Sequence, residues 1–214
     1  METLRVLIEV ATYIQLFTFF ISLLTWSKYK HTRLKYLPIL LGVTACLEVF
    51  CYNFYPTNNV WLYNLKALFE FNFLCFIFYG YLGKLSRKIC IGMIAIFNLI
   101  YFFNFLVIQD FRTDLLTYTY VLSSFFFIII IIMVLNEMLK VESFDGIQRN
   151  LLFWVSAAYF IFYATTFPIF SISNLKELLG DFQLPTIKVL LVVILIMHST
   201  FITGFLWSKK KYSY

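Results

Sequence analysis

Seven apolar stretches of about 20 residues each fill most of this 214-residue chain, and the polar segments between them are short. The hydrocarbon core of a bilayer is about 30 Å thick, which about 20 helical residues can cross. Hydrophobic residues form 62% of the chain and charged residues 13%, whereas soluble domains are roughly half apolar and roughly a quarter charged. We therefore predict an all-α, polytopic membrane protein whose residues 1–214 form one seven-helix transmembrane domain. The predicted spans are residues 6–26, 37–55, 60–82, 89–108, 115–138, 150–172 and 186–207.

Basic residues are concentrated in the connections on one side of this predicted bundle. Four of them, Lys28, Lys30, Arg33 and Lys35, follow the first span, and this side holds 12 of the 17 Lys and Arg residues in total. Cytoplasmic loops of membrane proteins carry an excess of Lys and Arg. We therefore predict that the N-terminus lies outside the cell and the C-terminus in the cytoplasm. The formal charge of +6 is interpreted as a signal for topology and for anionic lipid headgroups, and direct nucleic-acid binding is not expected.

Three ionisable residues lie well inside the predicted spans, where each costs about 2.5–3.5 kcal/mol on insertion scales. Glu48 belongs to the second span, and Lys66 and Glu70 to the third. Lys66 and Glu70 are four residues apart, so they share one helix face. Glu48 lies near the outer end of its span and Lys66 near the outer start of the next, so a rise of about 1.5 Å per residue puts them at nearly the same height. We predict a polar cluster of these three side chains.

Two asparagines extend the predicted cluster, because Asn53 and Asn64 lie on the same two helices in the same outer half. Two interpretations of the cluster remain open. It is either a neutralised network that fixes the register of the helices, or a ligand, ion or proton site accessible from outside. Glu9 and Lys188 lie nearer to the membrane boundary, where long side chains can reach the interface.

Other features of the spans carry weaker predictions. The run from Phe125 to Leu135 contains no polar residue, so span five is expected to face lipid or a partner subunit on several sides. Pro168 is expected to bend or end span six, and Gly204 could allow two helices to approach closely. His198 is interpreted as a hydrogen-bonded interior residue. The segment 174–180 is predicted to form a short helix at the membrane surface.

Motifs of soluble and membrane enzymes are missing from the sequence. There is no GxSxG, HExxH, P-loop or GxGxxG pattern. The four cysteines form no CxxC pair, which disfavours a metal site. No aspartate lies deep in a predicted span, which argues against an intramembrane protease with paired aspartates. We therefore predict a protein with no enzymatic activity, no cofactor and no bound metal.

The segment from Asn58 to Asn64 (NNVWLYN), followed by Glu70 and Phe71, is similar to small multi-span proteins of AT-rich bacterial genomes. In size, density of spans and basic cytoplasmic loops, the whole chain also resembles the membrane accessory proteins encoded beside the RNA-guided RNA nuclease of type VI-B CRISPR loci. This resemblance implies location in a bacterial inner membrane and modulation of the nuclease without catalysis. The arginine and histidine spacing of one ribonuclease-bearing relative is not present.

Three hypotheses about function follow from the sequence. The first is a regulatory accessory protein whose basic cytoplasmic loops contact an RNA-guided nuclease or a signalling protein in antiviral defence. The second is a sensor or transporter that binds a small polar ligand or ion from outside through Glu48, Lys66 and Glu70. The third is a pore formed by a homo-oligomer, with apolar faces such as that of span five between subunits. The sequence slightly favours the first, because short loops suit contacts better than catalysis. In every case the lipid bilayer is the first partner.

Overall fold

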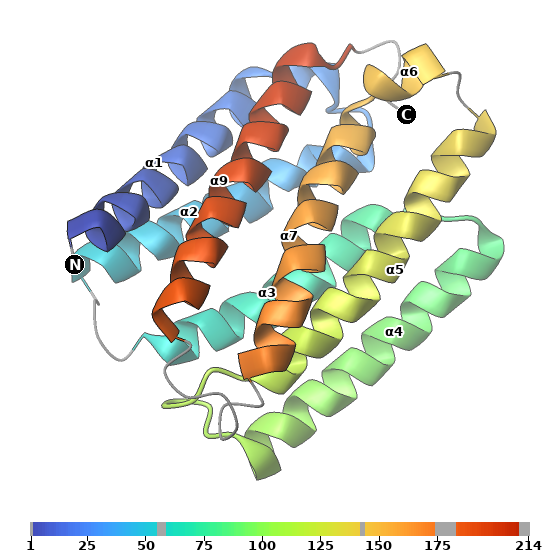
Figure 1. Cartoon of the computed structure of the whole chain (residues 1–214). Coiled ribbons are helices and arrows are strands. Elements are labelled where there is room, and N and C mark those ends of the chain that lie inside the picture. Colours follow the sequence, from blue (N-terminus) through green and yellow to red (C-terminus); the bar gives the residue numbers. More distant parts are fainter. Residues whose placement is uncertain (1, 55–58, 142–143, 174–182, 210–214) are drawn as a thin grey trace.

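The computed structural model describes residues 2–54, 59–141, 144–173 and 183–209, and these residues are almost entirely helical (Figure 1). Within these ranges, seven helices are long and apolar enough to cross a membrane. They are α1 (Glu2–Leu24), α2 (Leu37–Phe54), α3 (Val60–Tyr79), α4 (Lys84–Phe103), α5 (Thr117–Val141), α7 (Leu151–Ser173) and α9 (Gln183–Trp207). The shorter elements are η1 (Trp26–Lys28), η2 (Arg33–Tyr36), the π-helical turn η3 (Asn104–Ile108) and α6 (Phe144–Gln148). The prediction of an all-helical fold with seven helices able to span a membrane is confirmed for the described residues.

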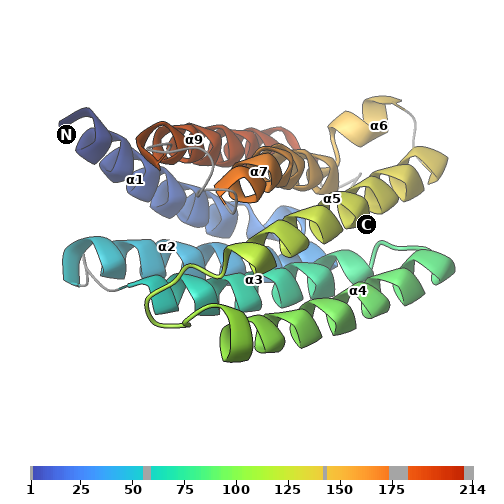
Figure 2. The ribbon, with the colours of Figure 1, turned by 60° about the horizontal axis from the view of Figure 1, so that its bottom comes forward.

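The seven long helices form a closed ring in chain order, because each packs on the next and α9 returns to α1. Figure 2 shows the ring flattened into two layers, with α1, α9 and α7 on one side and α2, α3 and α4 on the other. Helix α5 joins the layers, since it contacts α7 in one and both α3 and α4 in the other. The interior of the ring is therefore bounded by helices from both halves of the chain.

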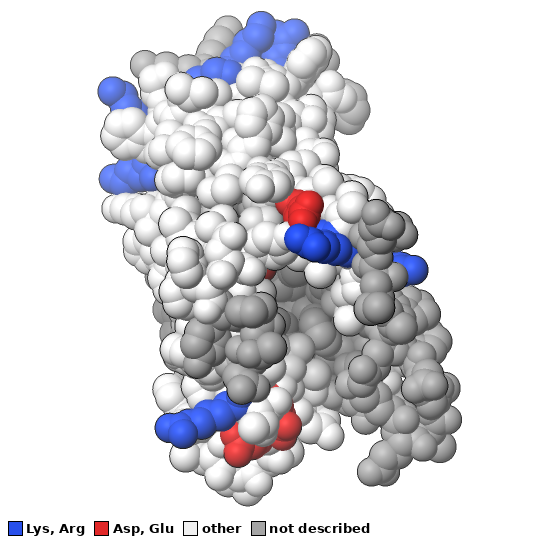
Figure 3. Space-filling model, turned by 90° about the vertical axis from the view of Figure 1, so that its left-hand side faces the viewer, with Lys and Arg blue, Asp and Glu red and all other residues white. Residues whose placement is uncertain are grey.

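The connections at one end of the ring and the helix ends beside them contain most of the described basic residues, and we call this the basic end. It comprises the α1–α2 connection (25–36), the α3–α4 connection with the start of α4 (80–88), the end of α5, α6 with the start of α7, and residues 208–209. In Figure 3, Lys and Arg gather at the top, where the α1–α2 connection and the end of α9 lie. The other end, which we call the far end, contains the starts of α1, α3, α5 and α9. Which end faces the cytoplasm stays a prediction.

Aromatic side chains fill the ring between α3, α4 and α5. The rings of Phe71 and Phe97 lie 3.9 Å apart between centroids, and Phe127 meets Phe71 and Phe78 at 6.1 and 5.6 Å. All four side chains are buried. Edge-to-face and offset contacts of this kind add to the gain from apolar burial, so they fix α5 against the α3–α4 pair.

The expectation that span five faces outward holds for one side of the helix only, on which Phe125 and Ile132 are exposed. Phe127, Ile130, Ile131 and Val134 are buried within the ring, and α5 packs on three helices. A purely apolar helix suits a lipid surface and a protein interior equally well, because hydrocarbon tails and apolar side chains differ little in polarity. The pore hypothesis therefore retains only the exposed side of α5 as a possible contact between subunits.

The predictions for Pro168 and Gly204 have different outcomes. Helix α7 does not end at Pro168 but continues to Ser173, although Pro168 has no N–H to donate within the helix. Gly204 lies against α7, where an added Cβ would be 2.3 Å from the Cβ of Trp154. The backbone of α9 therefore approaches α7 through this glycine. The predicted surface helix at 174–180 lies outside the described residues.

We predict that Gly204→Ala destabilises the protein by about 1–3 kcal/mol, because the new methyl group overpacks the α7–α9 contact. Gly92→Ala is the matched control, since a Cβ at Gly92 has nothing within 4 Å and alanine has the higher helix propensity. Thermal unfolding of both variants in the same detergent measures the difference. Equal melting temperatures for the two variants would contradict the close approach.

Candidate functional site

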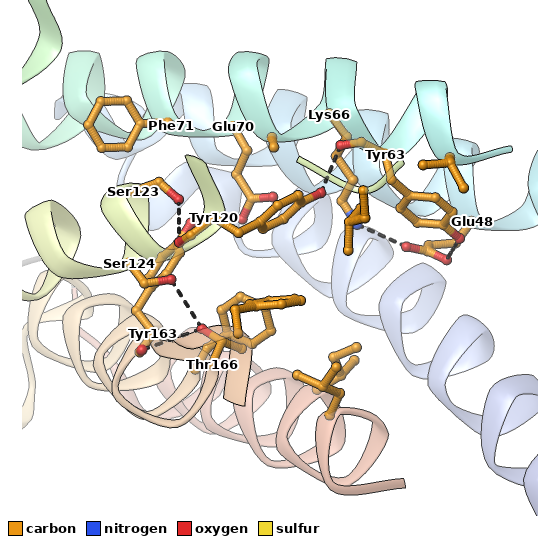
Figure 4. Close-up of a pocket in the computed structure, with 17 residues that line it drawn as sticks. Glu48, Tyr63, Lys66, Glu70, Phe71, Tyr120, Ser123, Ser124, Tyr163 and Thr166 are labelled. Carbon is orange, nitrogen blue, oxygen red and sulfur yellow. Dashed lines mark hydrogen bonds and ion pairs between the residues drawn. The ribbon is translucent and has the colours of Figure 1, made fainter. Parts of the chain in front are cut away.

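A cavity of about 370 Å³ lies inside the ring toward the far end, between α2, α3, α5, α7 and α9 (Figure 4). Ligand sites in proteins commonly have volumes of about 300–1,000 Å³ and apolar walls with a few polar groups. Glu48, Lys66 and Glu70 all line this cavity. A smaller cavity of about 50 Å³ shares these three residues and extends the space toward α1 and His198. The ionisable residues of the second and third spans therefore meet at one internal space.

Glu48 and Lys66 form an ion pair between α2 and α3. The helical rise predicts that these two residues lie at nearly the same height in the membrane. Lys66 Nζ lies 2.9 Å from Glu48 Oε1, and the Tyr63 hydroxyl donates a 2.9 Å hydrogen bond to Glu48 Oε2. The Lys66 ammonium also lies 5.6 Å from the centroid of the Tyr63 ring. Both carboxylate oxygens of Glu48 are thus used within the protein, and the charge of Lys66 is balanced.

Glu70 occupies the next turn of α3 and is not part of that ion pair. Its Oε1 accepts a 3.2 Å hydrogen bond from the Tyr163 hydroxyl of α7. Among the described residues, Glu70 has no cationic side chain within ion-pair distance. Counted as ionised, Glu48, Lys66 and Glu70 carry one net negative charge, and this excess is located at Glu70.

Hydroxyl groups from α5 and α7 continue the polar wall beyond Glu70 (Figure 4). Tyr120 donates to the carbonyl of Tyr63 at 2.8 Å, and Ser123 donates to the carbonyl of Tyr120 at 3.0 Å. Thr166 donates to the carbonyl of Tyr163 at 3.3 Å, which leaves Ser124 as the donor in its 3.4 Å contact with Thr166. These bonds fix the side chains that surround the carboxylate.

The two asparagines of the predicted cluster do not line the cavity. The Asn64 amide is buried and forms three hydrogen bonds with the α4–α5 connection. It donates to the carbonyls of Phe111 and Asp114 and accepts from the N–H of Leu116. The Asn53 side chain is exposed and donates to the carbonyl of Val49 in its own helix. Asn64 has a structural role at the far end, whereas Asn53 lies on the outer surface.

Other ionisable residues in the spans lie outside the cavity or at its edge. His198 is buried, and its Nδ1 lies 3.1 Å from the Thr18 hydroxyl, so it is hydrogen-bonded in the interior. Glu9 accepts hydrogen bonds from Arg5 and from the Tyr52 hydroxyl at the surface between α1 and α2. Lys188 is exposed on α9. None of these groups supplies the missing countercharge of Glu70.

The four basic residues of the α1–α2 connection fall into two pairs. Lys28 donates to the carbonyls of Phe205 and Leu206 at the end of α9, and partial burial there lowers its pKa below the usual value. Arg33 donates to the carbonyl of Phe76. Cationic side chains satisfy the free carbonyls of helix C-termini in this way. Lys30 and Lys35, in contrast, are exposed.

The described residues contain no group of three or more His, Cys, Asp or Glu side chains arranged to hold a metal ion. Cys51, Cys75 and Cys90 are buried, whereas Cys46 is exposed, and none of the four forms a disulfide. The chemistry available in the cavity is therefore that of one ion pair, one further carboxylate, neutral hydroxyls and aromatic rings.

Sequence reasoning missed the contribution of α5 and α7 to the site. Tyr120, Ser124, Tyr163 and Thr166 line the cavity, yet the chain contains 15 tyrosines and nothing in their spacing distinguishes these. Tyr163 meets Glu70 across 93 residues of sequence. A hydroxyl-bearing residue in the middle of an apolar span was the only available signal, and it is weak.

Comparison of the chain with protein-family models, with curated proteins and with solved structures finds no match in any of the three. The site must therefore be judged from its own geometry.

We predict that Glu48→Gln alone destabilises the protein by about 1–3 kcal/mol, because it leaves the Lys66 ammonium without its anion. Adding Lys66→Met to Glu48→Gln should restore part of this loss, since the unpaired charge is then removed. A double-mutant cycle of unfolding free energies in detergent measures the coupling. Additive effects of the two substitutions would contradict a direct ion pair.

Proposed function

We propose that this protein is a multi-pass membrane protein that binds a small polar ligand in the cavity at the far end of the helix ring. Seven helices able to cross a membrane support the first part of this proposal. The observation that carries the second part is Glu70, a carboxylate that lines a cavity of about 370 Å³ without a cationic partner among the described residues.

The distribution of charge suggests the direction from which the ligand enters. If the basic end faces the cytoplasm, as the excess of Lys and Arg in loops predicts, the cavity lies in the outer half of the membrane. The protein would then act as a sensor or transporter in a bacterial inner membrane, with a ligand taken from outside.

We predict that Glu70→Gln abolishes ligand-induced stabilisation while the protein remains folded. Glu9→Gln is the matched control, because Glu9 bonds Arg5 and Tyr52 at the surface and lines neither the cavity nor the basic-end hollow. Thermal stabilisation of purified protein by a panel of small cations, anions and neutral polar compounds is the measurement. A panel in which no compound raises the melting temperature of the unmodified protein would contradict a ligand site.

A second candidate function is favoured by the structure of the basic end. A hollow of about 500 Å³ lies there between the α1–α2 connection, the α3–α4 connection, α5 and α7, and Arg33 and Arg87 line it. Exposed Lys30 and Lys35 lie on the same connection as Arg33. These features support a contact between the basic end and an acidic surface of a cytoplasmic protein. The resemblance to CRISPR accessory proteins makes an RNA-guided nuclease the proposed partner.

The four basic residues of the α1–α2 connection differ in their contacts, and this difference allows a specific test of the second function. We predict that Lys30→Gln combined with Lys35→Gln weakens nuclease-dependent interference with phage while protein level and topology stay unchanged. Lys28→Gln combined with Arg33→Gln should instead reduce the amount of folded protein, because both residues bond helix carbonyls. Phage plaque counts with the nuclease present, together with membrane protein levels, measure both effects. Full interference by the Lys30 and Lys35 variant would contradict the accessory function.

A further inference from the structure

The charge balance of the cavity favours one class of ligand. Lys66 is neutralised by Glu48 at 2.9 Å, so an anionic ligand would have to compete with a carboxylate already in place. The Tyr163 hydroxyl donates to Glu70, and no described cationic side chain lies at ion-pair distance from it. An incoming cation could therefore contact the Glu70 carboxylate directly, without displacing an ion-pair partner.

The hydroxyl groups in the cavity wall also favour a cationic ligand. Tyr63 and Tyr163 donate to Glu48 and Glu70, and Tyr120 and Ser123 donate to backbone carbonyls. Ser124 and Thr166 use their hydrogens in the chain that ends on the carbonyl of Tyr163. The hydroxyl hydrogens of the cavity are therefore already engaged, and an anion would find few donors. Lone pairs remain available to a ligand that donates or carries positive charge.

Aromatic rings form much of the remaining wall. Tyr120 and Phe170 pack together at 5.0 Å between centroids, and both line the cavity with Phe162 and Tyr163. The negative faces of aromatic rings attract organic cations, and desolvated sites strengthen this attraction. A carboxylate surrounded by rings is the arrangement that binds substituted ammonium groups.

We propose that the cavity binds a small organic ammonium ion, with its charged nitrogen beside Glu70 and its carbon substituents against the rings of α5 and α7. This inference rests on the proposed function, because it names the class of ligand for the same cavity. An inorganic metal ion is a poorer candidate, since the described residues offer no cluster of three metal-binding side chains.

The experiment compares choline with its uncharged carbon isostere, in which carbon replaces the nitrogen. Binding to the full chain in lipid nanodiscs is measured by calorimetry for the unmodified protein, Glu70→Gln and Glu9→Gln. Choline is expected to bind the unmodified protein and Glu9→Gln equally, and Glu70→Gln at least about tenfold more weakly. The isostere is expected to bind all three proteins as weakly as choline binds Glu70→Gln, because it lacks the charge.

Other outcomes separate this inference from the proposed function. Equal binding of choline and its isostere to the unmodified protein would overturn the ammonium site even if Glu70→Gln failed to fold, while a ligand cavity would stand. Binding of acetate but not of choline, ethylamine or tetraethylammonium would likewise overturn the inference alone. No binding of any of these probes, charged or neutral, would overturn both the ammonium site and the ligand cavity.

Discussion

Lys66 can lie inside the helix ring because Glu48 neutralises it across the α2–α3 interface. An isolated ammonium in a medium of low dielectric would cost several kcal/mol, and the 2.9 Å contact with a carboxylate offsets that cost. The pair also has a geometric consequence. It requires α2 and α3 to present these residues at one height, and the tyrosine that completes it, Tyr63, lies on the same helix as Lys66. The cavity is built outward from this pair, with Glu70 one turn further along α3 and the hydroxyls of α5 and α7 facing it (Figure 4).

The sequence predicts the fold well because the length of an apolar span is set by the bilayer, whatever the helices pack against. The common height of Glu48 and Lys66 could be derived for the same reason, since the two spans are joined by a short connection. Whether an individual side chain is exposed or buried could not be derived from the sequence. Asn53 and Asn64 look equivalent in the sequence, yet one is exposed and the other is buried against the α4–α5 connection. Span five shows the same difficulty, because an apolar run does not indicate which faces of the helix contact lipid and which contact protein.

The basic residues show how one residue type can serve two purposes. Counting Lys and Arg is sufficient for a topology prediction, and the count treats Lys28 and Lys30 alike. The structure separates them, because Lys28 reaches the last carbonyls of α9 whereas Lys30 is exposed. Arg33 is fixed in a similar way and crosses Gly80, where an added Cβ would be 2.1 Å from its side chain. Residues that tie the ends of helices together are poor candidates for partner contacts, so the exposed lysines define the surface that a partner could use.

The two candidate functions share the helices that would have to connect them. Helix α7 places Tyr163 and Thr166 at the cavity and Leu152 at the basic-end hollow, and α5 places Ser124 at the first and Glu137 at the second. A ligand beside Glu70 can influence the basic end only if it binds two arrangements of these helices with different affinity. The Tyr163 to Glu70 hydrogen bond is the contact at which such a difference would arise, because it joins α7 to the excess charge of α3. By linkage, a partner that favours one arrangement at the basic end would change ligand affinity by the same factor. The sensor and accessory functions are therefore compatible within one ring of helices.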